Sequence, residues 1–366
     1  MTSPVPHRVR TGAIKTLQAI GTLALAVCGA LIAKAVQLPL PFMIGAMLAT
    51  TLAALFKLKI GGYGVQLPMT LRLIMVPVIG VMLGSSFTPE IIGQMRDWWA
   101  TMLGLAVFVA IVLTVNYRIY NRVFGFDKPT AFFSSIPGGV IESAILGEMA
   151  GGDSRTIALT HFCRVLIAVL AIPITMRLIF GPVGSAAISP AVFDSALSLL
   201  DVALLTTAGF LGFLTARQLK FPGAAITGPM VFSAFIHVMG WTEGHPPSWL
   251  IITAQVIMGA TLGTRFAGYT IGQALNALKA SVVGVAVMIT TAVIIALILR
   301  PLIAESFTAM ILAYAPGGLA EMSLIALSLK IGVAFVATHH IARIMFAMIG
   351  APIAFRLFVD RKPKKP

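Results

Sequence analysis

Charged residues are scarce in this chain. Only 10% of its 366 residues are Asp, Glu, Lys or Arg, while 58% are hydrophobic and the mean hydropathy is +0.97. Soluble domains carry about a quarter of their residues as charges. So few charges cannot cover a water-facing surface of this size, which excludes the soluble globular, disordered and disulfide-scaffold classes. Cysteine is nearly absent too, and because Cys28 and Cys163 lie in apolar stretches, neither a disulfide framework nor a cysteine-based metal site is expected.

Acidic residues are rarer than basic ones: the chain has 12 Asp and Glu and 26 Lys and Arg, which gives a net charge of +14. The basic residues are dispersed between apolar runs, which is typical of the positive-inside rule rather than of a nucleic-acid surface. We therefore expect the lipid bilayer, and not a nucleic acid, as the partner. The apolar runs are long and continuous, which predicts an all-α, multi-pass membrane protein rather than an outer-membrane barrel.

The apolar segments fall into two series of six. Several are near or below the ~20 residues that span a bilayer, so some are expected to be tilted, broken or re-entrant. The first series lies at about 16–32, 41–56, 69–86, 98–117, 130–149 and 157–178, and the second at 197–216, 222–240, 249–264, 280–299, 307–329 and 333–357. We predict a basic tail at 1–15, a first membrane repeat at 16–180, a second at 181–358, and a basic tail at 359–366.

An internal duplication is the strongest signal in the chain. The stretch from Ile136 to Glu142, with Pro-Gly-Gly near its start, recurs 179 residues later from Ala315 to Glu321. The same spacing relates other chemically distinctive pairs: His161 and His340, Arg164 and Arg343, Gly80 and Gly259, Gly84 and Gly263. One ungapped spacing that joins so many residues indicates a duplicated module.

The orientation of the two halves follows from which segments cross the membrane. Twelve crossings would make the repeats parallel. If the segments 130–149 and 307–329 instead enter and return to the same side, each repeat has five crossings and the repeats are inverted. The second arrangement places more of the basic residues on the cytoplasmic side, so the positive-inside rule favours ten spans, two re-entrant hairpins and cytoplasmic termini.

Pro-Gly-Gly inside an apolar segment breaks a helix, because proline lacks a donor and glycine adopts dihedrals that other residues avoid. Such backbone is tolerated at membrane depth only where it is buried in protein or lines a polar cavity. Glu142 and Glu321 lie about one turn beyond each break, near a helix N-terminus that stabilises negative charge. The residues predicted to line the break are Pro137, Gly138, Gly139, Pro316, Gly317 and Gly318.

The helix after each break carries a histidine and an arginine three residues apart, and therefore on one face. These are His161 with Arg164, and His340 with Arg343. A hairpin would bring each glutamate to the depth of this pair, and unpaired charges at that depth are costly. The pairs Glu142–Arg164 and Glu321–Arg343 are then either structural ion pairs or parts of a transport and coupling site, and the two interpretations are compatible.

Other polar residues have simpler explanations. Gly80, Gly84 and their counterparts are expected at helix–helix contacts. The pair His339–His340 suggests a metal, but no cysteine or carboxylate lies at ligand spacing, and we expect neither metal nor cofactor. Asp201, inside an apolar run, is either a helix-start residue or a third ionisable group.

On the duplicated Pro-Gly-Gly-x-x-Glu followed by His-x-x-Arg, the chain resembles the bacterial membrane AbrB family over roughly residues 15–358. Members are labelled as ammonia monooxygenases or as regulators of gene expression, and the name is shared with an unrelated DNA-binding regulator. The resemblance implies a bacterial inner-membrane protein. The architecture is also similar to transporters with inverted repeats and broken helices, although the paired aspartates of many such transporters are missing.

Three functions follow from these observations. The first is an ion-coupled secondary transporter of a small solute, with the glutamates as proton or cation sites and the arginines as sites for an anionic group of the solute. The second is a membrane-embedded regulator or sensor. The third, a membrane monooxygenase, would require converging ligands that the chain hardly offers. The transporter interpretation predicts no catalytic residue, and it is compatible with a homo-oligomer.

Overall fold

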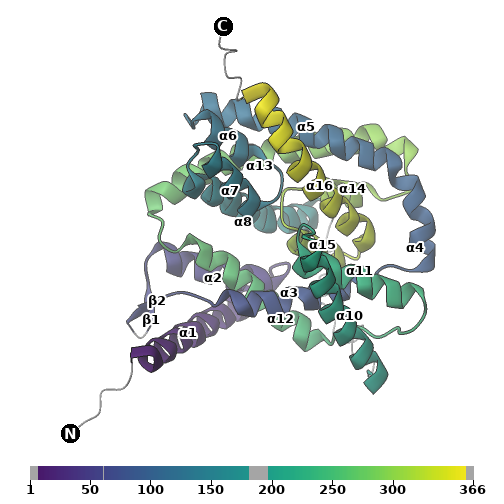
Figure 1. Cartoon of the computed structure of the whole chain (residues 1–366), viewed down its shortest axis with the longest axis horizontal. Coiled ribbons are helices and arrows are strands. Elements are labelled where there is room, and N and C mark those ends of the chain that lie inside the picture. Colours follow the sequence, from purple (N-terminus) through teal and green to yellow (C-terminus); the bar gives the residue numbers. More distant parts are fainter. Residues whose placement is uncertain (1–6, 61, 181–196, 360–366) are drawn as a thin grey trace.

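The computed structural model describes residues 7–60, 62–180 and 197–359, and within these ranges the chain is almost entirely helical (Figure 1). Seven of the described helices are long and apolar enough to cross a membrane, and shorter apolar helices lie between them. The predicted all-α, multi-pass membrane class is therefore confirmed. Of the predicted tails at 1–15 and 359–366, residues 1–6 and 360–366 lie outside the described ranges, and residues 7–15 belong to the first helix. The predicted boundary at 180/181 also falls at the edge of an undescribed range.

Apart from a strand pair and one short helix of the first half, the described parts of the two halves contain corresponding α-helices in the same order. The first half contains α1 (His7–Ala35), α2 (Pro41–Leu55), the short strands β1 (Lys59–Ile60) and β2 (Tyr63–Gly64), α3 (Met69–Gly84), α4 (Pro89–Gln94), the turn η1 (Met95–Trp98), α5 (Trp99–Arg122), α6 (Lys128–Ser135), α7 (Val140–Met149) and α8 (Ser154–Phe180). The second contains α10 (Leu199–Gln218), α11 (Ala224–Val238), α12 (Ser248–Gly263), η2 (Thr264–Phe266), α13 (Ile271–Leu299), η3 (Arg300–Leu302), α14 (Phe307–Tyr314), α15 (Leu319–Ser328), α16 (Val333–Ala354) and η4 (Phe355–Val359). The two strands pair in an antiparallel hairpin.

The helices form two groups, and each group draws on both halves of the chain (Figure 1). In the first group, α1 packs on α2, α10 packs on α11, and the halves join where α2 meets α12 and α3 meets α11. The second group contains α5 to α8 and α13 to α16, joined where α13 meets α5 and α8. Helices α15 and α16 also contact α3, so the second interrupted segment lies where the two groups meet.

Glycine allows the two halves of the first group to approach closely. A Cβ added to Gly80 or Gly84 would lie only 2.5 or 2.4 Å from main-chain carbonyl oxygens of α11, and one added to Gly259 or Gly263 would come within 2.2 or 2.6 Å of carbonyl oxygens of α2. Any side chain at these positions would push the helices apart. The predicted helix-packing role of these glycines is therefore confirmed.

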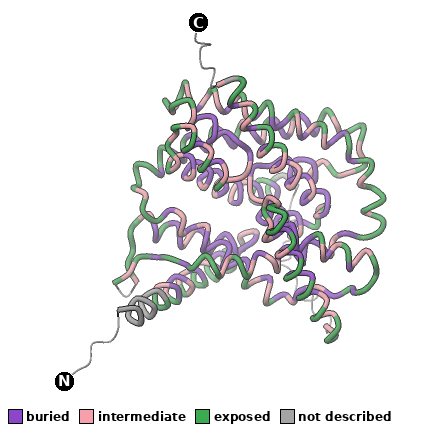
Figure 2. Tube along the Cα trace, in the orientation of Figure 1, coloured by how far each residue is buried: buried purple, intermediate pink, exposed green. Residues whose placement is uncertain are grey.

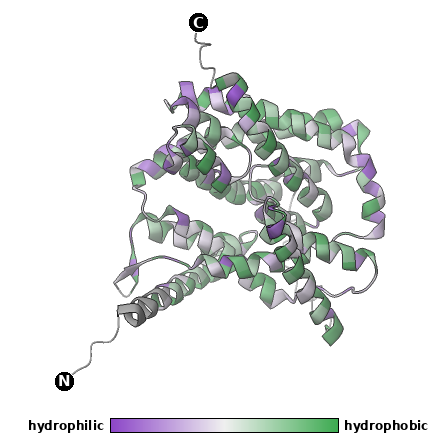
Figure 3. Ribbon diagram, viewed as in Figure 1, coloured by the Kyte–Doolittle hydropathy of each residue, from purple (hydrophilic) through white to green (hydrophobic). Residues whose placement is uncertain are grey.

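Hydrophobic side chains lie outside the protein as well as inside it. Buried residues gather where helices meet, while exposed ones mark the outer faces (Figure 2). Many of the exposed residues are hydrophobic, for example Leu103, Val107 and Ile111 along α5 (Figure 3). An apolar outer surface of this extent fits lipid rather than water.

Asp201 is a helix-start residue. The Ser198 hydroxyl accepts a hydrogen bond from the Asp201 N–H at 3.1 Å, and the Asp201 carboxylate accepts one from the Ser198 N–H at 3.0 Å, which is a capping box. The other carboxylate oxygen accepts from the Thr242 hydroxyl at 2.5 Å and so ties the loop after α11 to α10. The alternative of a third ionisable group in the core is not what the structure shows.

Candidate functional site at the two Pro-Gly-Gly breaks

Each Pro-Gly-Gly sequence separates two half-helices. Helix α6 begins at its N-cap Asp127 and α14 at its N-cap Ser306, and both end just before the proline. The residue preceding proline cannot remain helical without a clash, and Ile136 and Ala315 are indeed extended, with ψ of 125° and 145°. Helices α7 and α15 restart directly after the second glycine.

The two ends of each interrupted segment lie together. At the start of α6, the Thr130 hydroxyl accepts a hydrogen bond of 2.8 Å from the N–H of Asp153, which follows α7. In the second half, a Cβ added to Gly332, after α15, would lie 3.2 Å from the carboxylate of Glu305, before α14. Each segment is therefore a helical hairpin that begins and ends at the same place, with its break at the far end.

In the first half, the His-x-x-Arg pair of α8 binds the carbonyl groups that the break leaves without helical partners. Nε2 of His161 lies 2.9 Å from the carbonyl oxygen of Phe133, and Nη1 of Arg164 donates to the carbonyl oxygen of Ile136 at 2.7 Å. The last carbonyls of a helix have no donor within it and carry partial negative charge. Both side chains are buried, so the protein itself supplies the donors that water would otherwise provide.

The second half repeats this arrangement at matching positions of α16. Nε2 of His340 lies 3.0 Å from the carbonyl oxygen of Leu312, and Nη1 of Arg343 donates to the carbonyl oxygen of Ala315. These carbonyl groups again lie 179 residues after their counterparts in the first half. The sequence indicated the histidines and arginines but not their partners, because a main-chain carbonyl carries no sequence signal other than the broken helix.

The glutamates do not pair with the arginines, so the predicted ion pairs are wrong. Among the described residues, neither Glu142 nor Glu321 forms a salt bridge. Instead, each carboxylate folds back over the glycine that precedes its helix: a Cβ added to Gly139 would lie 3.3 Å from Oε2 of Glu142, and one added to Gly318 would lie 2.0 Å from Oε2 of Glu321. The reason is electrostatic, because the carboxylate lies at the positive start of one half-helix and the guanidinium at the negative end of the other.

The second guanidinium nitrogen is bound differently in the two halves. Nη2 of Arg164 donates to Nδ1 of His161 at 2.8 Å. Nη2 of Arg343 instead donates to the carbonyl oxygen of Gly317, inside the break, at 2.5 Å, and Nδ1 of His340 has no hydrogen-bond partner among the described residues. The same side chain thus takes two positions in two copies of one motif.

The backbone of the two breaks differs in the same region. Gly139 is left-handed, with φ 56° and ψ 63°, whereas Gly318 is extended, with φ −79° and ψ 157°. The helices that follow differ in exposure: Ile145 of α7 is 53% exposed, while Leu324, its counterpart in α15, is 1% exposed. We call the first hairpin, with this exposed face, open and the second, packed against its neighbours, closed.

The two breaks approach a common centre. Added Cβ atoms at Gly138 and Gly139 would lie 3.4 and 3.8 Å from Ile344 and Met348 of α16, which belongs to the other half. Helix α15 in turn contacts α8. Nε of both Arg164 and Arg343 has no hydrogen-bond partner among the described residues.

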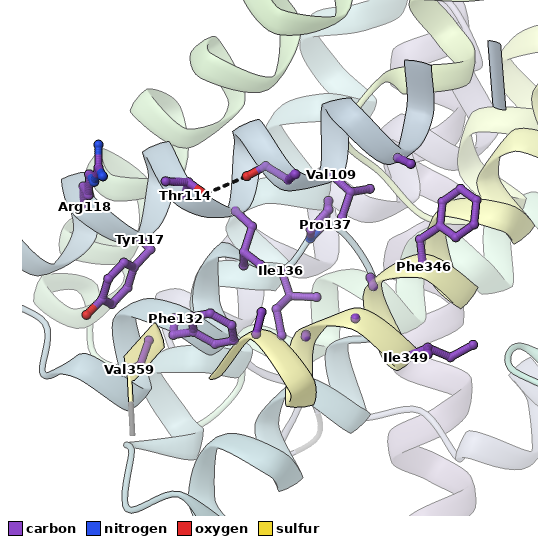
Figure 4. Close-up of a pocket in the computed structure, with 17 residues that line it drawn as sticks. Val109, Thr114, Tyr117, Arg118, Phe132, Ile136, Pro137, Phe346, Ile349 and Val359 are labelled. Carbon is purple, nitrogen blue, oxygen red and sulfur yellow. Dashed lines mark hydrogen bonds between the residues drawn. The ribbon is translucent and has the colours of Figure 1, made fainter. Parts of the chain in front are cut away.

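A cavity of about 810 Å³ reaches the first break from the side of α5 and α16 (Figure 4). Its lining is mostly apolar, and the Thr114 hydroxyl on its wall is already bonded to a carbonyl of its own helix at 2.8 Å. The residues of the second break do not line this cavity. Labelled residues around it include Val109, Tyr117, Phe132, Ile136, Pro137 and Phe346.

Within the described ranges, no three His, Cys, Asp or Glu side chains gather in a way that could hold a metal ion. His339 neither approaches a carboxylate cluster nor shares the carbonyl contacts of His340. It lies among the rings of Trp98, Phe335 and Tyr314 instead. Phe335, four residues earlier on the same helix, could be expected there from the sequence, but the other two rings come from η1 and α14.

Comparison with known proteins gives a consistent result. The family model described as "Transition state regulatory protein AbrB" matches residues 42–359. The "Uncharacterized protein YhjN" of Bacillus subtilis strain 168 is 27% identical over 79% of this chain and 79% of its own length. The "Putative regulator AbrB" of Escherichia coli strain K12 is 23% identical over 90% of this chain and 93% of its own length. Both relatives therefore match over most of their length.

Proposed function

Since the chain belongs to the AbrB family and is a membrane protein, we propose that it is a secondary transporter that moves a small solute past the two Pro-Gly-Gly breaks. The observation that carries this proposal is the presence of one motif in two conformations, one open and one closed. A static scaffold has no need of two conformations. A transporter that alternates between two accessible states requires a bistable element at its site.

The proposed topology has ten spans and two re-entrant hairpins in inverted repeats. The adjacent ends of each hairpin support it, as do the lengths of the half-helices. At 1.5 Å per residue, the eight residues of α6 and the ten of α7 reach about 12 and 15 Å, roughly half of a hydrocarbon core. The break then lies near the midplane. The crossing helices are α1, α2, α3, α5, α8, α10, α11, α12, α13 and α16.

The distribution of basic residues supports cytoplasmic termini. In this topology, the loops at the open end of the first hairpin face the cytoplasm together, and Arg155 there donates to the carbonyl oxygen of Gly268 at 3.2 Å. Basic residues are denser on this side than on the other, as the positive-inside rule requires for an inner membrane. Those in or beside the cytoplasmic loops include Lys57, Lys59, Arg122, Lys128, Arg155, Lys220 and Arg265, against Lys34, Arg96, Arg177, Arg300 and Lys330 opposite.

The charges at the breaks suggest the chemistry of the solute. Arg164 and Arg343 place a guanidinium group at each break, and each has a buried Nε–H without a partner among the described residues. Two restarting half-helices add their N-terminal partial charges. We propose that an anionic group of the solute binds there, and that Glu142 and Glu321 carry the coupling proton or cation.

The test measures how accessible introduced cysteines are to a labelling reagent, so the solute need not be known. Ile145→Cys and Leu324→Cys are made separately in a Cys28→Ser background, because Cys28 is exposed and Cys163 is buried. A membrane-impermeant maleimide is then applied to oriented vesicles from either side. We expect fast labelling of Ile145→Cys from the cytoplasmic side and slow but complete labelling of Leu324→Cys from the opposite side. If Leu324→Cys is never labelled, the second hairpin is permanently closed and the proposal fails.

The Escherichia coli relative is named as a regulator, which favours membrane regulation as a second candidate function. An effect on gene expression can also arise indirectly, when transport changes the level of a metabolite. A variant locked in one conformation separates the two: persistent expression effects in such a variant would favour regulation without transport.

A further inference from the structure

The cavity that reaches the first break is a groove between α5 and α16. Its floor is apolar and buried, since Val109 and Phe132 are 8% and 3% exposed, whereas Phe346 and Ile349 on its rim are 38% and 64% exposed. A Cβ added to Gly350, beside that rim, would meet no atom within 4 Å, so α16 does not close against α5 there. The groove is therefore open to the surroundings of the protein.

The length and the lining of the groove match one half of a membrane. Its α5 wall extends over the twelve residues from Ala106 to Arg118, which is about 18 Å of helix. One leaflet is half of a hydrocarbon core of about 30 Å. Water finds few partners in the groove, because the Thr114 hydroxyl on its wall already bonds to its own helix. A hydrocarbon chain fills such a space more favourably than water does.

One end of the groove is charged. Figure 4 shows Arg118, Tyr117 and Val359 at this end and Phe346 and Ile349 at the other. Among the described residues that line the groove, Arg118 has the only charged side chain, and it forms no salt bridge or hydrogen bond within the described ranges. In the proposed topology, α5 and α16 both end on the cytoplasmic side. The charged end of the groove therefore lies at the level of the cytoplasmic headgroups.

The sequence adds positive charge directly beyond this end. Val359 lines the groove, and the residues that follow it in the chain include Arg361, Lys362, Lys364 and Lys365. A basic cluster immediately cytoplasmic of a membrane helix attracts anionic lipid headgroups. The charges at this end therefore favour a ligand that combines a negative headgroup with an apolar chain.

From these features we infer that the groove binds an anionic phospholipid of the cytoplasmic leaflet, with one acyl chain between α5 and α16 and the headgroup phosphate at Arg118. A guanidinium suits this role because it binds phosphate oxygens and stays charged. The long arginine side chain reaches the headgroups from a position one turn before α5 ends at Arg122. The inference goes beyond the proposed transport function and takes from it only the topology.

The bound acyl chain contacts the first break. Ile136 and Pro137 form part of the groove, whereas the residues of the second break do not. A ligand that binds one arrangement of a protein stabilises that arrangement by mass action. Anionic phospholipid therefore stabilises the arrangement of the first hairpin in which this groove is present.

The experiment is native mass spectrometry of the full chain, freed of lipid in detergent and mixed with equal amounts of phosphatidylglycerol and phosphatidylcholine that carry the same acyl chains. We expect one phosphatidylglycerol to be retained in preference to phosphatidylcholine. Arg118→Gln should lower this preference about fivefold, which is the effect of one basic residue at an anionic lipid surface. Gly350→Leu places a side chain in the open space and should weaken the binding of both lipids.

Arg217→Gln is the matched control. Arg217 is an exposed arginine in the last turn of α10, on the cytoplasmic side in the proposed topology, and it does not line the groove. This variant should keep the lipid preference of the parent protein. Equal retention of the two lipids by the parent, equal losses in Arg217→Gln and Arg118→Gln, or undiminished binding in Gly350→Leu would overturn the inference.

Two further results would assign the groove to another occupant and would also overturn the inference. Displacement of phosphatidylglycerol by glycerol phosphate would indicate a site for free phosphate, and a lipid-free dimer would indicate a second copy of the chain. The measurement requires neither transport nor cysteine labelling. A failure of the lipid site and a failure of labelling at Leu324→Cys therefore remain distinguishable.

Discussion

The second glycine of each break, Gly139 or Gly318, is where a substitution by alanine should shift the conformational equilibrium. The two substitutions should shift it in opposite directions. Gly139 is left-handed, and an L-residue there costs roughly 1–2 kcal/mol. Gly318 is extended, a conformation that alanine adopts freely, so the methyl group need only displace the end of the flexible Glu321 side chain. If the two breaks exchange conformations together, Gly318→Ala penalises the exchanged state and Gly139→Ala penalises the present one. Because about 1.4 kcal/mol is tenfold in an equilibrium, each shift is on the order of tenfold.

The assay is again maleimide labelling of Ile145→Cys and Leu324→Cys. Gly318→Ala should lower the labelling rate of Leu324→Cys about tenfold and leave that of Ile145→Cys unchanged. Gly139→Ala should raise the labelling rate of Leu324→Cys and lower that of Ile145→Cys, by amounts set by the same penalty. Gly272→Ala, at a helical position with open space around it, is the control for an added methyl group. Changes of the same sign in both glycine variants, or none, would refute the reasoning, because the difference between the breaks would then be fixed by packing.

Three further predictions concern stability, measured as Tm by thermal unfolding in detergent. Arg343→Met should lower Tm more than Arg164→Met, because Arg343 satisfies two break carbonyl groups and Arg164 only one, and an unsatisfied buried group costs about 1–3 kcal/mol; equal shifts would contradict the assigned contacts. Asp201→Ala should lose about 1 kcal/mol with the capping box, and Asp201→Asn less. Burial raises the pKa of Glu305, so the folded protein holds this proton more tightly than the unfolded chain, and stability falls as the pH rises above the ordinary carboxyl range. Glu305→Gln should therefore gain Tm relative to the parent protein as the pH rises, and a constant difference would count against this explanation.

Composition and the internal duplication were sufficient to predict the fold class, the broken segments and the residues that gather at the breaks. Helix ends were predicted less well where polar residues continue a helix. The apolar run at 280–299, for example, misses the first turns of α13, which begins at Ile271 behind a capping box between Thr270 and Gln273. Hydropathy records where a helix meets lipid, whereas capping determines where it begins.

The partners of the charges were not predictable in the same way. Opposite charges at similar depth suggested ion pairs between Glu142 and Arg164 and between Glu321 and Arg343, but each charge lies at a helix end of opposite sign. Those helix ends exist only because the backbone is broken, and the charge of a helix end cannot be read from residue types. The difference between the two halves was also hidden, since equivalent motifs predict equivalent structures.

The contacts that stay constant explain how such a motif can change conformation at low cost. In both halves the histidine Nε2 and the arginine Nη1 bind equivalent carbonyl groups, so these two bonds survive a switch. Only Nη2 changes, from the histidine Nδ1 in the first half to the break carbonyl in the second, which replaces one hydrogen bond by another. No donor is lost, so the cost of about 1–3 kcal/mol for an unsatisfied buried group is not incurred at the arginine. What the exchange does release is Nδ1 of His340, which has no hydrogen-bond partner among the described residues.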